Sequence, residues 1–280
     1  MATGIDHIVI AVRDLEQAVA DYTAAGFTVT PGGEHTSGET HNALIAFSDG
    51  TYFELIAWKN PDATNDTPWW HRFQAGEGFV DYALSVADLD VEVERLRSEG
   101  LDVPEPTPGG RLRPDGQAVE WQTLRLDPER HPSLPFYCHS INDRALRVPS
   151  GEAAVHANGV SSVHKIFIGV ASLEQAAADY RIVAGITLDE DAHNNPAANR
   201  WQQFRVGTFN IVLIEPEESE SELARSIAAR GEVPIEVALK STNDQGSSID
   251  PSLTHGAKLA ILEVEHTVET PDWEPQEKEL

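Results

Sequence analysis

The sequence predicts an α+β fold built from repeated βαβββ modules, and three observations support this prediction. Residues 4–27 pass from a strand pattern, in which Ile8, Ile10 and Val12 alternate with other side chains, to a helical apolar stripe over residues 15–22. The same order of patterns returns further along the chain. The 280 residues, 40% of them apolar, are enough for two domains or one duplicated domain.

The first module begins with the strand that carries His7 and continues into a capped helix. Asp14 as N-cap with Gln17 three residues later resembles a capping box, and Gly26 suits the helix end. A strand ending in a Pro-Gly-Gly turn at residues 31–33 is expected next. After it, two strand-like runs around an Asp-Gly turn signal predict a hairpin. This module covers about residues 4–60.

A second module is expected over about residues 78–141, after a short helix that contains Trp69, Trp70 and Phe73. It repeats the strand, the capped helix and a terminating glycine. A turn-rich stretch and two strands follow, which complete the order β, α, β, β, β. Together the two modules form a predicted first domain, residues 1–146.

A third copy of the helix gives the clearest repeat. LEQAVADY at residues 15–22 returns as LEQAAADY at residues 173–180. A fourth module without its helix follows, so residues 159–268 are predicted to be a degenerate module pair. The segment before residue 159 has the small and polar composition of a linker. The acidic, proline-containing residues 269–280 predict a disordered tail.

The charge balance opposes two classes of partner. Asp and Glu number 46 against 20 Lys and Arg, a formal net charge of −26, which opposes nucleic acid and anionic membrane surfaces. One cysteine, Cys138, cannot form an internal disulfide, and neither a signal sequence nor an apolar run of about 20 residues is present. We expect an acidic cytoplasmic protein, monomer or homodimer, whose partner is a small-molecule substrate.

The chain resembles the vicinal oxygen chelate superfamily, in its glyoxalase-like domain branch (glyoxalase/bleomycin resistance/dioxygenase fold). The resemblance rests on the βαβββ repeat, the first-strand histidine and the glutamate in TYFELIAW. Over residues 4–160 it also rests on PGGEHTSGETHNALIAF, on RLRPDG followed by VEW, and on LPF before HANG. It implies that two modules close into a cupped mixed sheet around one divalent metal ion. The ligands would come from the first and last strands of each module.

His7 and Glu54 are the first candidate metal ligands. Imidazole and carboxylate are groups that Zn, Fe, Mn or Ni accept. Each residue lies in the middle of an apolar strand, where a polar side chain is costly unless something pairs with it. The repeat makes the two positions neighbours at the open face of one sheet.

The second module departs from the four His, Glu or Gln ligands that are usual in the family. Alignment of the modules puts Asp81 at the position of His7. The equivalent of Glu54 falls near Tyr137, with His139 two residues along on the same strand face. Three alternatives stay open. His7, Glu54 and His139 hold the metal with water, or Asp81 ligates and His139 acts as base, or His7 and Glu54 pair without a metal. The candidate catalytic residues are Glu54, Asp81 and His139.

In the third module, Lys165 stands at the position of His7 and Ile211 at that of Glu54. A centre of this kind cannot be built from those residues. The chemistry is therefore assigned to the N-terminal half of the chain.

Six residues are candidates for substrate binding because they cluster where a cavity is expected. Two histidines flank a Gly-rich loop, and the alternative is that they cap its turn. Three arginines suit a bidentate grip on a carboxylate, or pair with surface Asp and Glu. A mid-strand tryptophan is a core residue or a stacking wall. These residues are His35, His41, Arg111, Arg113, Trp121 and Arg144.

The leading functional expectation is a metal-dependent isomerase or lyase. A divalent cation would chelate two adjacent oxygens of a small organic substrate and stabilise an enolate-type intermediate. The alternatives are a non-catalytic, resistance-type protein that sequesters a small molecule, and a ring-cleaving dioxygenase. The dioxygenase is expected to need two histidines and one glutamate, with His139 as the second histidine.

Overall fold

Eight strands from the first half of the chain close into a barrel in the computed structural model, which describes residues 1–62, 67–183, 187–188, 199–242 and 247–262. The first strand pairs parallel with β4 and antiparallel with β5, and β5 pairs parallel with β8. The two halves of the barrel therefore use the same pairing. In barrel order the strands are β1 (Ala2–Ala11), β4 (Tyr52–Trp58), β3 (Thr40–Ala46), β2 (Thr30–His35), β6 (Thr107–Leu112), β7 (Ala118–Leu124), β8 (Phe136–Ser140) and β5 (Gly78–Val86).

The helices of this half begin where the sequence patterns predict. The Asp14 side chain accepts from the backbone N–H of Gln17, and Asp88 accepts from Val91 in the same way. Both caps follow a buried strand directly, so each strand feeds straight into its helix. The helices are α1 (Leu15–Ala24), α2 (Pro68–Gln74), α3 (Leu89–Ser98), α4 (Arg144–Arg147) and the 3₁₀ turn η1 (Gly151–Ala154).

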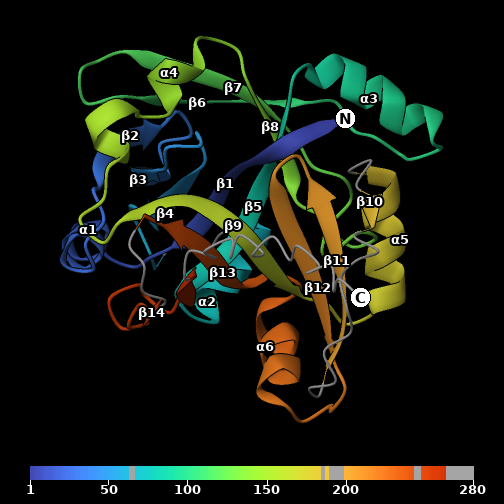
Figure 1. Ribbon diagram of the computed structural model, residues 1–280. Coiled ribbons are helices and arrows are strands. Elements are labelled where there is room, and N and C mark those ends of the chain that lie inside the picture. The colour runs from blue at the N-terminus through green and yellow to red at the C-terminus, as the bar shows by residue number, and fades with distance from the viewer. Residues whose placement is uncertain (63–66, 184–186, 189–198, 243–246, 263–280) are drawn as a thin grey trace, which may run out of the picture.

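The second half of the chain forms an open, seven-stranded sheet. Its strand β9 pairs parallel with β12 and antiparallel with β13, as β1 does with β4 and β5. Strand β14 follows β13 too closely for a helix like α1. In order the strands are β10 (Thr187–Leu188), β11 (Asn199–Val206), β12 (Phe209–Pro216), β9 (Val160–Gly169), β13 (Pro234–Ser241), β15 (Leu259–Leu262) and β14 (Ser247–Ser248). The helices are α5 (Leu173–Val183) and α6 (Glu222–Arg230) (Figure 1).

Both Pro-Gly-Gly stretches lie inside strands, which corrects the turn predicted at residues 31–33. They fall in β2 and β6, and these two strands pair to close the barrel. A Cβ on Gly33, where φ is +129°, would lie 2.0 Å from the carbonyl oxygen of Leu112. Gly33 is therefore needed for the close approach of β2 and β6 rather than for a turn.

The linker-like segment packs against the barrel. Val148 and Ala154 of this segment form a small buried cluster with three barrel residues, Leu44 and Ala46 of β3 and Tyr52 of β4. The segment therefore covers part of the barrel interior and carries side chains into it. The predicted domain boundaries stay a prediction, and the predicted tail, 269–280, lies outside the described residues.

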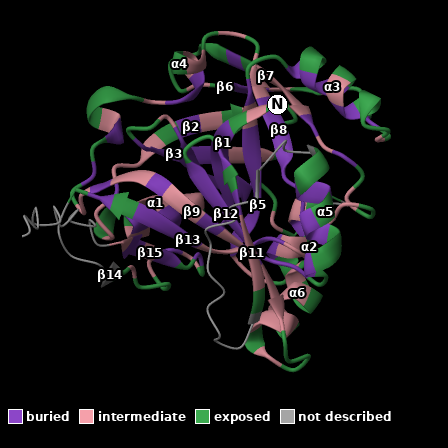
Figure 2. Cartoon of the chain, turned by 45° about the vertical axis from the view of Figure 1, so that its right-hand side comes forward, coloured by how far each residue is buried: buried purple, intermediate pink, exposed green. Residues whose placement is uncertain are grey.

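The buried core runs through both sheets. Strand residues are mostly buried, whereas exposed residues gather on the helices and connecting segments (Figure 2). Tyr82 of the barrel and Tyr180 of α5 are both buried, and their hydroxyl groups hydrogen-bond to each other. Within the part of the chain that the structure describes, no helix is long and apolar enough to cross a membrane.

Candidate functional site

A cavity of about 430 Å³ lies inside the barrel. Strands β1, β2, β3 and β4 bring His7, His35, Asn42 and Glu54 to its wall, and β6, β7 and β8 supply the facing side. Volumes of this size are ordinary for small-molecule sites. The cavity is therefore the candidate functional site.

His7 of β1 lines this cavity and follows an irregularity in the strand. The register between β1 and β5 shifts between Ile5 and His7, and such irregularities re-aim side chains. Asp6 and His7 are both buried, with His7 Nδ1 2.7 Å from Oδ1 of Asp6. Burial alone would raise the pKa of Asp6, but Arg147 and His7 hold it well below its usual value. The carboxylate is ionised, so it accepts the Nδ1 proton.

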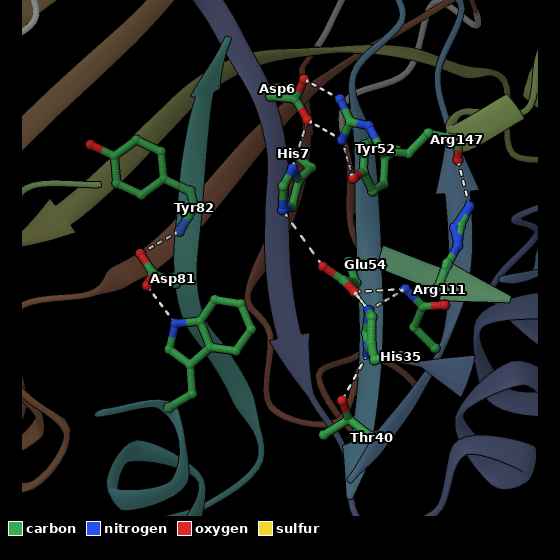
Figure 3. A network of polar contacts seen from close by, with 12 residues as sticks. Asp6, His7, His35, Thr40, Tyr52, Glu54, Asp81, Tyr82, Arg111 and Arg147 are labelled. Carbon is green, nitrogen blue, oxygen red and sulfur yellow. Dashed lines mark hydrogen bonds and ion pairs between the residues drawn. The ribbon is translucent and has the colours of Figure 1, made fainter. Parts of the chain in front are cut away.

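Glu54 lies between two imidazoles (Figure 3). Its Oε2 is 3.6 Å from Nε2 of His7, and its Oε1 is 3.3 Å from Nε2 of His35. The amide of Asn42 donates to Oε1 over 2.7 Å. Burial raises the pKa of Glu54, but His35, His7 and Asn42 outweigh it and lower the pKa to about 2. Glu54 is therefore a buried carboxylate that stays ionised.

The two histidines are oriented alike. His35 Nδ1 lies 2.8 Å from the hydroxyl of Thr40, as His7 Nδ1 lies beside Asp6. In both, Nε2 is left to face Glu54. An oxygen partner on one ring nitrogen is the arrangement that orients histidines in metal sites.

The orientation of His7 leaves two electron-rich atoms facing each other. Because Nδ1 donates to Asp6, Nε2 is the His7 nitrogen that faces the ionised Glu54, and without a proton on Nε2 a lone pair would point at the carboxylate. Two buried acceptors in this position need a proton or a cation between them. Imidazole and carboxylate are also ligands for Zn and Fe. The donor set therefore fits a divalent cation.

Asp6, His7 and Cys138 form another compact group, with one ligand atom of each within 4.8 Å of the others. Among the described residues, no other three His, Cys, Asp or Glu residues lie this close together. Asp6 is already paired with Arg147 and Arg144. Burial, with a contribution from Asp6, raises the pKa of Cys138 to about 12, so its thiol stays protonated. Both features disfavour a cation at this group.

Asp81, predicted as a ligand or catalytic carboxylate, is bound elsewhere in the barrel. Its Oδ1 accepts the N–H of the next residue over 2.8 Å, and Oδ2 pairs with Arg125 and accepts from the indole of Trp69. Figure 3 shows it apart from Glu54. Because both oxygens are engaged, Asp81 anchors Arg125 and does not join the histidines.

The structure also corrects the prediction for His139. The pairing of β5 with β8 places Phe136 where the pairing of β1 with β4 places Glu54, so Phe136 and not Tyr137 is the equivalent residue. A slip of one residue moves every side chain to the other face. His139 lies outside the cavity, with Nδ1 3.3 Å from the carbonyl oxygen of Val86. It is therefore placed neither to ligate nor to act as base.

Three of the six candidate substrate-binding residues line the cavity: His35, Arg111 and Trp121. Trp121 contacts the His35 ring edge-on, with centroids 5.9 Å apart. Cys138 lines the cavity too.

The other three candidates lie outside the cavity wall. Arg113 donates to the carbonyl of Leu146 and Arg144 pairs with Asp6. His41 neighbours the cavity residue Asn42 on β3 and so projects to the opposite face.

The third module lacks the donor set, as predicted. The pairing of β9 with β12 places Val212, rather than the predicted Ile211, at the position of Glu54, and Lys165 stands at that of His7. An aliphatic residue occupies the carboxylate position in either register. The described part of the second sheet therefore has no counterpart of the His7 and Glu54 pair.

Several residues of the site were not predicted, among them Asp6, Asn42, Arg125 and Arg147. Asp6 had a signal, because an acidic residue beside a histidine is unusual in an apolar strand. Arg147 had none, since it comes from a segment with linker composition and yet is only 3% exposed.

Comparison with known proteins supports this fold. The model of the glyoxalase-like domain family matches residues 5–181. A hypothetical protein from Staphylococcus aureus has a similar structure, with 15% identity, coverage of 92% of this chain and 98% of that one, and a TM-score of 0.72. A mutant of 4-hydroxymandelate synthase from Streptomyces coelicolor also matches, with 15% identity, coverage of 87% and 72%, and a TM-score of 0.55. No curated protein matches the chain by sequence.

Proposed function

Because the chain belongs to the glyoxalase-like domain family, we propose that it is a metal-dependent enzyme acting on a small organic substrate with two adjacent oxygens. His7, His35 and Glu54 would hold a divalent cation, Zn, Fe, Mn or Ni. The observation that carries this proposal is Nε2 of His7 facing the ionised Glu54 at 3.6 Å. Two histidines and one glutamate are a known ligand set of catalytic zinc sites.

When bound, the cation would act as a Lewis acid toward charge that develops on a substrate oxygen. Glu54 serves as a ligand rather than as a base, because a pKa of about 2 makes it a weak proton acceptor at neutral pH. Its carboxylate lies between the imidazoles, so joint coordination requires the Glu54 side chain to rotate. Asp6 keeps His7 in the tautomer that presents Nε2.

Within this function we propose an isomerase or lyase that works through an enolate-type intermediate. Such a reaction needs a group that takes a proton from a substrate carbon. Two glutamates line the cavity, the buried Glu54 and the exposed Glu39. Because Glu54 is assigned to the metal, Glu39 is the candidate base. Burial raises the pKa of Tyr52 well above its usual value, so its hydroxyl keeps its proton.

A ring-cleaving dioxygenase is the second candidate, and the position of His35 favours it. His35 provides the second histidine that His139 does not. Two histidines and one carboxylate are typical ligands of non-haem Fe(II) oxygenases. Oxygen uptake with 3,4-dihydroxybenzoate by the Fe(II)-loaded protein distinguishes the two candidates.

Metal binding is the experiment that tests the proposal. We expect equilibrium dialysis and elemental analysis to find one ion per chain, and His7→Ala and Glu54→Gln to lose it. His41→Ala, a histidine outside the cavity, is the matched control and keeps the ion. Equal metal in the wild type and His7→Ala would sink the proposal. Chelator-insensitive binding of aromatic compounds without turnover would favour the sequestering alternative instead.

A further inference from the structure

Arg111 is a buried cation in the cavity wall, and no carboxylate among the described residues forms an ion pair with it. It is 4% exposed, and its Nε and Nη2 donate to the backbone carbonyls of Gly32 (3.4 Å) and Arg147 (2.7 Å). The other two cavity arginines are paired, Arg125 with Asp81 and Arg147 with Asp6. Among the described residues, no Asp or Glu forms an ion pair with Arg111.

The strand pairing places Arg111 on the same face as a candidate metal ligand, His35. Arg111 is directly opposite His35 in the β2–β6 ladder, and directly opposite residues share a face of the sheet. Arg111 therefore projects to the same side as His35, beside the candidate ligands. Burial lowers its pKa, as expected for a charge that has lost water, although a guanidinium stays protonated.

Arg111 is the cavity arginine whose charge no ion pair among the described residues balances. The residues lining the cavity include three arginines and two glutamates. Two of the arginines are balanced by Asp81 and Asp6. Of the glutamates, Glu54 is already bound by Asn42 and the two histidines. The positive charge of Arg111 therefore favours an anionic ligand beside it over a neutral or cationic one.

Flat apolar surfaces make up much of the remaining wall. Three of the six tryptophans of the chain line the cavity, with Tyr52 and Phe136. Trp58 is fixed by a stacked contact with Phe73, with centroids 4.8 Å apart. Aromatic walls suit a flat apolar body, which packs against their faces and edges.

We propose that the cavity takes an aromatic carboxylate whose carboxylate group pairs with Arg111 and whose ring packs against the tryptophans. This inference rests on the proposed function in so far as it names the substrate class of the same site. A guanidinium and a carboxylate match in shape, so two parallel hydrogen bonds can form. The ligand thereby supplies the ion-pair partner that the described residues do not give Arg111.

Binding to the chelator-treated, full-length chain tests this proposal without any metal. Isothermal titration compares 2-naphthoate with its neutral analogue 2-naphthamide. We expect naphthoate to bind at least about 30-fold more tightly, the effect of one well-paired buried charge. Equal affinities of the two compounds would overturn the proposal.

Two variants assign the effect to Arg111. Arg111→Gln removes the preference for naphthoate, whereas Arg113→Gln, two residues along and outside the cavity, preserves it. If Arg111→Gln does not fold, Arg111→Lys replaces it, and we expect weaker naphthoate binding with unchanged naphthamide binding. Unchanged naphthoate affinity in the Arg111 variant would contradict the assignment. Because the metal has been removed, this failure is distinct from a failure of the dialysis experiment on His7.

Discussion

Arg147 forms a two-bond ion pair with Asp6, the residue before His7 in β1. Nη1 donates to Oδ1 at 2.7 Å and Nη2 donates to Oδ2 at 2.9 Å. The same Asp6 carboxylate accepts the Nδ1 proton of His7. One buried ion pair thus fixes the imidazole whose other nitrogen faces Glu54. Arg147 comes from α4, after the last strand of the barrel, so the site depends on the segment that follows the barrel.

Removal of Arg147 is predicted to destabilise the fold. Arg147→Met leaves the Asp6 carboxylate buried with less compensation, and we expect a loss of about 3–5 kcal/mol in unfolding free energy. Urea unfolding followed by circular dichroism measures it. Arg144→Met is the matched control, because Arg144 also pairs with Asp6 but is 40% exposed. The control should lose no more than about 1 kcal/mol, and equal losses in both variants would refute the account of this pair.

The low pKa of Glu54 predicts a specific acid sensitivity. Its folded-state pKa of about 2 lies below the ordinary value of 4.5. The stability that Glu54 contributes is therefore present above about pH 4.5 and is lost as the pH falls toward 2. Urea unfolding across this window should show a shallower pH dependence for Glu54→Gln, by up to about 1.4 kcal/mol per pH unit. Parallel curves for both proteins would contradict this assignment.

Cys138 is predicted to be inert although it lines the cavity. Its pKa of about 12, raised by burial, leaves little thiolate at neutral pH. We expect iodoacetamide to label the folded protein at about a thousandth of the rate for the unfolded chain. Mass spectrometry over time measures both rates. Labelling of the folded protein at the unfolded rate would show that the thiol is ionised, and the group of Asp6, His7 and Cys138 would then become a candidate metal site.

The parts of this fold that follow from local physics were predictable. Asp14 and Asp88 cap their helices as expected, because an N-cap needs only a side-chain oxygen and a nearby backbone N–H. His7 and Glu54 also come together as expected, because the repeat implied that their strands are neighbours.

The errors come from long-range geometry. The position of His139 depended on the register between β5 and β8, and a one-residue slip was enough to reverse its direction. The glycines of β2 read as a turn, since only the fold reveals that β6 approaches them closely. The placement of Arg147 depends on how a segment of linker composition packs into the barrel, which no local pattern specifies.

The central claim is that His7, His35 and Glu54 hold one divalent cation. A crystal structure of the Zn-loaded protein, with anomalous diffraction recorded at the zinc edge, tests it most directly. We predict one peak about 2.0–2.2 Å from Nε2 of both histidines and from a Glu54 oxygen. A peak at Asp6 and Cys138, a peak that His35 does not reach, or no peak in the barrel would contradict the claim.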